Sequence, residues 1–149
     1  MKKPRLFIDV DGVILARYGK DGFFQMRPYV GDFLRFAVKN FKPYWLTCHG
    51  PLSTDSIASL NSMGGNQIGY AEWRHDSMDK VGGVIANGGL LGEWFAVEDE
   101  YPLAEAKAFL RGHGLLHRWI IVPRSGRDTL LRTIEELKRR ILPSGRTPR

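Results

Sequence analysis

Residues 5–13 read RLFIDVDGV, an apolar run that ends in two aspartates and a glycine. The run is short and is followed by the turn signal Asp11-Gly12, so we predict a buried strand and then a loop. A turn at this point would let Asp9 and Asp11 address one site. An Asp-Gly turn also follows many strands that carry no site, so the rest of the chain must decide what this pair does.

Apolar runs alternate with helical patterns along the rest of the chain. Compact apolar runs predict further strands at 44–47, 68–70, 94–97 and 119–122. Amphipathic stripes, caps and stop signals predict helices at 30–38, 53–63, 79–87, 102–110 and 128–141, with a loop or small hairpin at 17–27. Strands that alternate with helices indicate an α/β fold, and we expect a three-layer, Rossmann-like domain with a mainly parallel sheet of about five strands.

Polar residues gather where these predicted strands end. Asp9 and Asp11 follow the first strand, Thr47 ends the second, and Glu98-Asp99 close the run at 94–97. Parallel sheets bind ligands beyond the carboxyl ends of their strands. The sequence therefore predicts that these residues converge on one site.

Length and composition bound the class of protein. A chain of 149 residues has room for one hydrophobic core, so we expect a single domain at 1–143 and a disordered basic tail at 144–149. No apolar run approaches the ~20 residues of a bilayer span. The apolar run near the N-terminus is also shorter than the about 7 to 15 residues of a secretory signal. One cysteine, Cys48, makes no internal disulfide, which fits a reducing compartment, and we expect a cytoplasmic protein.

The formal net charge of +6 comes mostly from the end of the chain. Five cations lie among the last twelve residues, which hold no acid: Lys138, Arg139, Arg140, Arg146 and Arg149. Such a run can make weak contact with nucleic acid or another polyanion. It is also typical of a solvated helix end that complements the helix dipole.

The polar residues resemble the four motifs of the haloacid dehalogenase superfamily, in the order that the family has them. The matches are Asp9-Val10-Asp11-Gly12-Val13, the strand YWLT ending at Thr47, Lys80, and the strand FAVED ending at Glu98-Asp99. Lys80 is the only lysine between Thr47 and Glu98. The acidic pair departs from the commoner Asp-Asp, so the resemblance leaves open which of its carboxylates is the main metal ligand.

The resemblance implies a role for each motif. It assigns Mg²⁺ to the Asp9 carboxylate, the Asp11 main-chain carbonyl and Glu98 or Asp99, an oxygen-only ligand set that this ion prefers. Asp9 would attack phosphorus and form an aspartyl-phosphate, and Asp11 would act as general acid and then as general base.

Further residues would bind the phosphoryl group and the rest of the substrate. The resemblance places the Thr47 hydroxyl and the neighbouring Cys48 and His49 at the transferring oxygens, and Lys80 between the phosphoryl group and Asp9. Four residues in loops expected near the site are also candidates for substrate contact: His49, Trp73, His75 and Arg124. Loop residues without a functional role remain the alternative for these four.

The resulting prediction is a capless, Mg²⁺-dependent phosphomonoester hydrolase. Within the family that the chain resembles, Asp11 favours phosphatase or phosphomutase chemistry over dehalogenation, because a halide leaves without a proton. A mutase must also protect its intermediate from water, for which the sequence offers no segment. Neither the interval from Asp11 to Thr47 nor that from Thr47 to Lys80 has room for a folded cap domain. The alternatives are a nucleotidase or nucleic-acid end phosphatase, and a non-catalytic binding module of the same fold. The phosphorylated substrate and the oligomeric state stay open.

Overall fold

The computed structural model describes residues 2–17, 24–47, 60, 62–64, 67–124 and 126–141. Five strands form one sheet in the order β5-β4-β1-β6-β7, and every neighbouring pair is parallel. The strands are β1 (Arg5–Ile8), β4 (Lys42–Trp45), β5 (Gly69–Tyr70), β6 (Trp94–Glu98) and β7 (Trp119–Ile121). The predictions for Cys48, His49, most of the helix at 53–63 and the tail at 144–149 concern residues outside this description.

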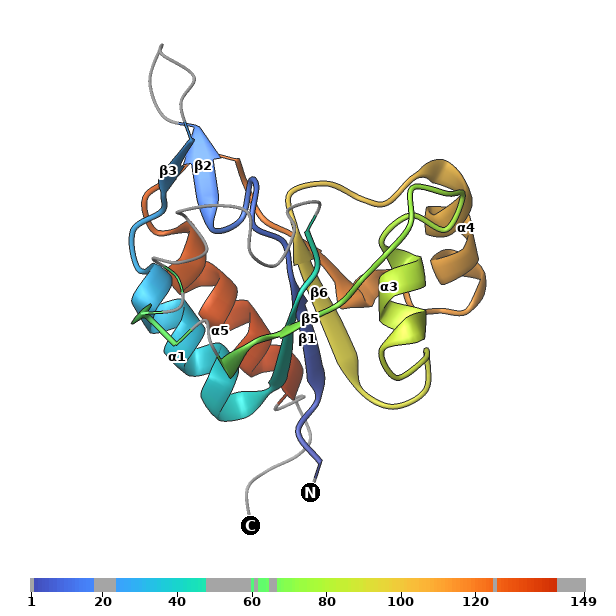
Figure 1. Cartoon of the computed structure of the whole chain (residues 1–149), viewed down its shortest axis with the longest axis horizontal. Coiled ribbons are helices and arrows are strands. Elements are labelled where there is room, and N and C mark those ends of the chain that lie inside the picture. The colour runs from blue at the N-terminus through green and yellow to red at the C-terminus, as the bar shows by residue number, and fades with distance from the viewer. Residues whose placement is uncertain are drawn as a thin grey trace.

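Helices cover both faces of the sheet, as the α/β prediction required. In Figure 1 the helices α1 (Val30–Asn40) and α5 (Thr129–Ile141) lie on one face, and α3 (Val81–Ala86) and α4 (Ala104–Gly112) lie on the other. A 3₁₀ turn, η2 (Leu116–Arg118), leads into β7. The three-layer arrangement of the described residues is therefore confirmed.

The central strands are buried on both faces, which is why they read as continuous apolar runs. On β1, Leu6 and Ile8 join the core beneath α1 and α5, whereas Phe7 joins the core beneath α3 and α4. All residues of β6 are buried. The register pairs Ile8 with Trp45 on one side and with Val97 on the other, so the residues that follow these three strands emerge side by side.

A hairpin rises from the same end of the sheet. Strands β2 (Leu15–Arg17) and β3 (Phe24–Met26) pair antiparallel, and Figure 1 shows them at the upper left, on the side of the sheet that α1 and α5 cover. The loop or small hairpin predicted at 17–27 is thus a hairpin whose first strand begins earlier, at Leu15, and whose residues 18–23 lie outside the described part. The described residues between Asp11 and Thr47 otherwise form α1 and β4.

The predicted boundaries of β4 and α4 differ from those in the structure. β4 begins at Lys42 rather than after Pro43. Proline has no N–H to donate, and it is tolerated here because β5 pairs with Tyr44 and Trp45 and, among the described residues, not with Pro43. Its end at Trp45 leaves Thr47 in the loop beyond the strand.

Helix α4 differs at its start. Pro102 was expected in its first turn, but the helix begins at Ala104. The N–H of Leu103 donates to Asp79 Oδ2 at 3.1 Å, and Leu103 has an extended backbone that precedes the helix. A contact from a distant loop thus sets this boundary.

Among the described residues, no helix has the length and apolar character that crossing a bilayer requires.

Candidate functional site

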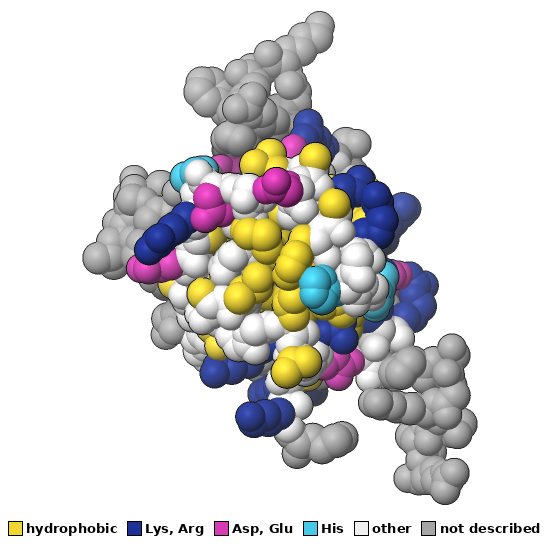
Figure 2. All heavy atoms as spheres, turned by 90° about the vertical axis from the view of Figure 1, so that its right-hand side faces the viewer, with side chains coloured by type: hydrophobic (Ala, Val, Ile, Leu, Met, Phe, Trp, Pro, Cys, Tyr) yellow, Lys and Arg dark blue, Asp and Glu magenta, His cyan; other side chains and the backbone are white. Residues whose placement is uncertain are grey.

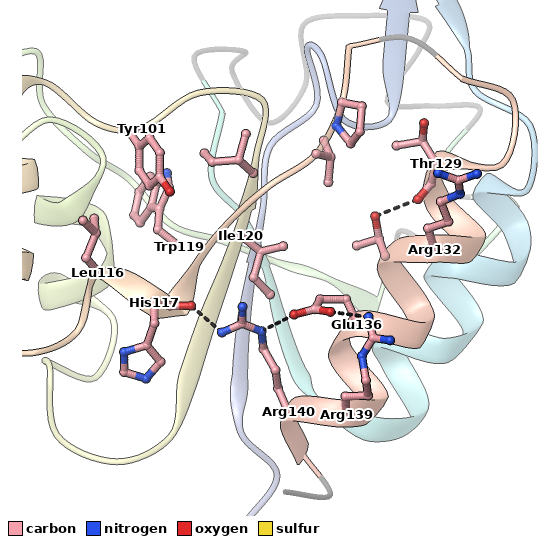
Figure 3. Close-up of a pocket in the computed structure, with 14 residues that line it drawn as sticks. Tyr101, Leu116, His117, Trp119, Ile120, Thr129, Arg132, Glu136, Arg139 and Arg140 are labelled. Atoms are coloured by element: carbon pink, nitrogen blue, oxygen red, sulfur yellow. Dashed lines mark hydrogen bonds and ion pairs between the residues drawn. The ribbon is translucent and has the colours of Figure 1, made fainter. Parts of the chain in front are cut away.

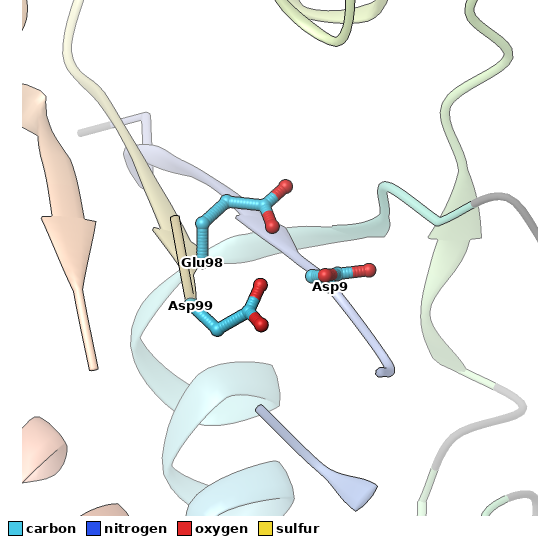
Figure 4. A group of neighbouring side chains, drawn as sticks. All are labelled: Asp9, Glu98 and Asp99. Carbon is cyan, nitrogen blue, oxygen red and sulfur yellow. The ribbon is translucent and has the colours of Figure 1, made fainter. Parts of the chain in front are cut away.

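Three carboxylates meet at the carboxyl ends of β1 and β6. Asp9 directly follows β1, Glu98 is the last residue of β6, and Asp99 comes next; one carboxylate oxygen of each lies within 4.8 Å of the other two. Figure 4 shows all three side chains turned toward the same space. The Asp9 N–H donates to Val97 O at 3.1 Å, so the sheet register itself sets Asp9 beside the acidic pair.

Lys80 joins this group from the start of α3. Its Nζ lies 3.1 Å from Asp9 Oδ1 and 3.0 Å from Glu98 Oε1, and its side chain is only 17% exposed. Burial acts to lower the pKa of Lys80, but the Glu98 and Asp9 carboxylates outweigh it and raise the pKa above its usual value. Lys80 is therefore a fixed cation between two carboxylates.

Asp9 and Glu98, the two buried carboxylates, differ in what stabilises their ionised forms. Burial raises the pKa of Asp9, while the charge of Lys80 and a hydrogen bond from the Val10 N–H at 2.8 Å oppose the rise. Burial, followed by the negative charge of Asp9, raises the pKa of Glu98 well above its ordinary value. The cluster thus holds more negative charge than Lys80 can balance.

The donor set fits a divalent cation. Three carboxylates and one ammonium leave a net charge of about minus two when all are ionised, which one divalent ion would cancel. Glu98 Oε1 is buried and, although it lies near Lys80 Nζ, accepts no well-aligned hydrogen bond within the described part of the chain. Oxygen ligands alone suit Mg²⁺ or Ca²⁺ better than a metal that prefers nitrogen or sulfur.

A tight turn follows Asp9, as the sequence predicted. The N–H groups of Ile14 and Leu15 both donate to Val10 O at 2.9 Å, and Gly12 has a left-handed backbone with φ 83°. A Cβ on Gly12 would come within 2.3 Å of Asp99 Oδ2. The absence of a side chain therefore lets the first loop close over the acidic pair, with Asp11 half-buried in the wall of the same cavity.

Thr47 lies in the loop after β4, next to β1. The Leu46 N–H donates to Ile8 O at 2.8 Å, and Thr47 itself is buried. Its carbonyl accepts a hydrogen bond from Trp73 Nε1 at 2.9 Å. The structure thus brings the Thr47 segment to the site end of the sheet and ties it to Trp73; Cys48 and His49, predicted for substrate binding, lie outside the described residues.

A cavity of about 310 Å³ contains the acidic group. It is lined by the residues of the first loop, the acidic pair and the two neighbouring loops, including Asp9, Asp11, Trp73, His75, Asp79, Lys80, Glu98, Asp99, Glu100, Tyr101, Pro102 and Trp119. Trp73 and His75, two of the predicted substrate contacts, are in this wall. Arg124 is not, but its Nε lies 3.6 Å from Asp99 Oδ2.

Two larger cavities lie away from the carboxylates. One, of about 600 Å³, runs along β7 between η2 and α5 (Figure 3). The other, of about 1010 Å³, lies at the amino ends of β1 and β4. Neither is lined by Asp9, Glu98 or Asp99, so of these three cavities only the smallest contains the acidic group.

Arg27 is a structural contributor that the sequence did not single out. It is buried, and its Nη2 donates to Gly12 O at 2.9 Å and Pro123 O at 2.7 Å. It therefore connects the residue after β3 to the loops after β1 and β7. An arginine before a proline gives no sequence signal for such a role, because both carbonyl partners are set by the fold alone.

Comparison with known proteins adds no family assignment. No protein-family model matches the chain, and no curated protein matches it significantly. Inference about function therefore depends on the fold and on the geometry of the acidic site.

Proposed function

We propose that the chain is a capless haloacid dehalogenase-type phosphatase, a Mg²⁺-dependent phosphomonoester hydrolase with Asp9 as its nucleophile. One observation carries the proposal: Lys80 Nζ lies 3.1 Å from Asp9 and 3.0 Å from Glu98, and Asp99 joins them within 4.8 Å. These residues come from three segments far apart in the sequence. A phosphate dianion repels a carboxylate nucleophile, so the reaction needs positive charge at this place.

Asp9, Glu98 and Asp99 would hold the ion, together with the Asp11 carbonyl that the resemblance assigns to it. When bound, Mg²⁺ neutralises charge on the phosphoryl oxygens and on the attacking carboxylate. Lys80 adds a second fixed cation. Because Lys80 already contacts Asp9, it also orients the nucleophile before substrate arrives.

In the first step an Asp9 carboxylate oxygen bonds to phosphorus while the bond from phosphorus to the leaving oxygen breaks. The carboxylic acid form of Asp11, in the same cavity wall, gives its proton to that oxygen, and the alcohol departs. In the second step a water oxygen attacks phosphorus, and the Asp11 carboxylate takes one proton from it. The bond from phosphorus to Asp9 breaks, which releases inorganic phosphate and restores both carboxyl groups.

Hydrolysis of 4-nitrophenyl phosphate with and without Mg²⁺ tests the proposal. We expect metal-dependent turnover that Asp9→Asn lowers by at least ~10³-fold, because the nucleophile is lost. Asp32→Asn is the matched control, since Asp32 lies on α1 and pairs with Arg35 at the surface. Borohydride reduction of the acyl phosphate followed by mass spectrometry should locate homoserine at position 9. Equal rates in the wild type and Asp9→Asn would refute the assignment.

Asp11 has a test of its own. We expect Asp11→Asn to lower turnover of an alkyl phosphate by about 10²–10⁴-fold, because the leaving alkoxide needs a proton. The loss should be smaller with 4-nitrophenyl phosphate, whose phenolate leaves more readily. The measurement is kcat/KM for both esters; equal losses would contradict a role in leaving-group protonation.

A further inference from the structure

The cavity beside the carboxylates extends between two loops that carry ring side chains. Trp73 and His75 come from the loop before α3, and Tyr101 and Pro102 from the loop after β6. All four line the same cavity as Asp9 and Asp11. The leaving group of a phosphate ester bound at Asp9 would therefore have aromatic side chains within its reach.

The Trp73 side is fixed in place. The indole Nε1 donates to Thr47 O at 2.9 Å, and Lys80 Nζ lies 5.7 Å from the centre of its ring. The exposed His75 ring packs on Trp73 with a centre-to-centre distance of 4.4 Å. An indole held at both its edge and its face presents a rigid surface, so little conformational freedom is lost when another ring packs on it.

The Tyr101 side is held by its neighbours. Trp119 is buried, and its Nε1 donates to Glu100 O at 3.0 Å, which fixes the loop that carries Tyr101. Asp79 ties the two loops together by accepting the Leu103 N–H at 3.1 Å. Tyr101 is 46% exposed, and Lys107 Nζ lies 4.2 Å from the centre of its ring.

The outer part of the cavity is acidic. Beyond the cluster at Asp9, its wall contains Asp79 and Glu100. Figure 2 shows acidic side chains on the upper half of the face that α3 and α4 cover. Arg124 reaches Glu100 at 3.6 Å, but its side chain is 72% exposed, so solvent screens it. A second phosphate at this place would meet Asp79 and Glu100, and the cations beside this part of the wall, Arg124 and Lys107, are not buried.

From these walls and this charge we propose that the site acts on monophosphate esters whose leaving group contains a flat aromatic ring and no second phosphate. This inference rests on the proposed phosphatase function and adds its substrate class. His75 and Tyr101 are the specificity-determining residues: they contact the leaving group and take no part in phosphoryl transfer. A nucleic-acid end, with its further phosphates, is a poor substrate under this proposal.

Two phosphonates that cannot be hydrolysed test the aromatic preference by binding alone. Benzylphosphonate and cyclohexylmethylphosphonate have the same charge and similar size, and only the first has a flat π-face. With Mg²⁺ present, we expect calorimetry to give the aromatic compound about five-fold tighter binding. In His75→Ala and Tyr101→Ala the difference should shrink to less than about two-fold. The control is His113→Ala, which removes a similar tilted ring contact, to Phe109 at 4.3 Å, outside the cavity.

Hydrolysis of two nucleotides tests the charge. We expect kcat/KM for adenosine 5′-monophosphate to exceed that for adenosine 3′,5′-bisphosphate by about ten-fold at low salt, with a smaller ratio at high salt. Equal binding of the two phosphonates, or a preference for the bisphosphate, would overturn the substrate class while phosphatase activity stands. If neither phosphonate binds and no ester is hydrolysed, the proposed function fails, and this inference fails with it.

Discussion

Gly12 is the residue of the first loop that lies against the Asp99 carboxylate. Its φ of 83° is in the left-handed region, and an added Cβ would lie 2.3 Å from Asp99 Oδ2. A side chain here would therefore have two separate costs: backbone strain, and displacement of a carboxylate from the acidic group. The two costs can be measured apart because the chain has a second left-handed glycine in open space, Gly89, with φ 74° and no atom within 4 Å of an added Cβ.

We expect Gly12→Ala to raise the Mg²⁺ concentration for half-maximal stabilisation or turnover by at least about ten-fold, because Asp99 must move. Gly89→Ala should lower the free energy of unfolding by about 1 kcal/mol through strain alone and leave Mg²⁺ affinity unchanged. Thermal melts over a Mg²⁺ titration report both quantities. If the two variants lose Mg²⁺ affinity equally, the contact with Asp99 is not what requires glycine.

At the scale of elements, Arg27 links three loops at the carboxyl end of the sheet. It follows β3 and donates to carbonyls after β1 and β7, at Gly12 and Pro123. A weaker bond of 3.4 Å reaches Gly126 O, just before α5. The hairpin is thereby attached to the loop that contains Asp11, although Arg27 does not line the acidic cavity.

We expect Arg27→Met to lower the free energy of unfolding by about 2 kcal/mol, because two part-buried carbonyls lose a donor that comes from a buried side chain. Mg²⁺ affinity should fall as well, since the Gly12 loop is no longer held. Urea unfolding followed by circular dichroism, with and without Mg²⁺, measures both. Arg35→Met, at an exposed position of α1, should change stability by less than about 0.5 kcal/mol. If Arg27→Met is destabilised but keeps its Mg²⁺ affinity, the hydrogen bonds of Arg27 do not position the metal-binding residues.

Helix α5 is attached to the segment before β7 through a chain of polar contacts. Glu136 accepts a hydrogen bond from Arg139 and one from Arg140 Nε at 2.9 Å, and Arg140 also donates to His117 O, as Figure 3 shows. These hydrogen bonds, the one from Arg139 foremost, lower the pKa of Glu136 below its ordinary value of 4.5. The ionised carboxylate is thus favoured in the folded chain.

We expect Glu136→Gln to be less stable than the wild type at pH 7. A folded-state pKa below the unfolded value means that the contribution is present above pH 4.5 and is lost as pH falls through the folded-state pKa. The two proteins should therefore converge in acid, as urea midpoints at several pH values will show. Glu135→Gln is the control, because the ion pair of Glu135 with Lys138 is more exposed to solvent. A gap that stays constant with pH would contradict the charge effect.

Across the whole molecule, a net positive charge of +6 coexists with a cluster of three carboxylates, of which Asp9 and Glu98 are buried and Asp99 is partly exposed. The fold brings these acids together at the ends of adjacent strands, where mutual repulsion opposes folding unless a cation is present. An ion that binds the folded chain and not the unfolded one stabilises it by mass action. The acidic cluster should therefore control the stability of the protein as well as its chemistry.

We expect saturating Mg²⁺ to raise the melting temperature by about 5–10 °C, which corresponds to about 2.7 kcal/mol at a hundred-fold excess over Kd. Sodium chloride at equal ionic strength is the control for general screening. Glu98→Gln should melt higher than the wild type without Mg²⁺, because one buried charge is removed, and should show little shift when the ion is added. The same shift in wild type and Glu98→Gln would place the ion elsewhere.

The sequence alone determined the alternation of strands and helices and the residues that close β1 and β6. Both are local properties: a buried strand is a short apolar run, an amphipathic helix repeats every 3.6 residues, and a loop residue stands where the run stops. That is why the parallel α/β class, Asp9 and the acidic pair could be predicted. The meeting of Asp9, Glu98 and Asp99 followed from the expectation that strand ends share one edge of the sheet.

Only the tertiary structure decided what crosses between segments. Four features each join residues that lie far apart in the sequence. They are the strand order, the contact of Gly12 with Asp99, the hydrogen bonds of Arg27 to other loops, and the hydrogen bond from Trp73 to Thr47. A side chain's partner in such a contact depends on sheet register and packing, which no local pattern encodes. The same reason explains the late start of α4, which a hydrogen bond to Asp79 fixes from another loop.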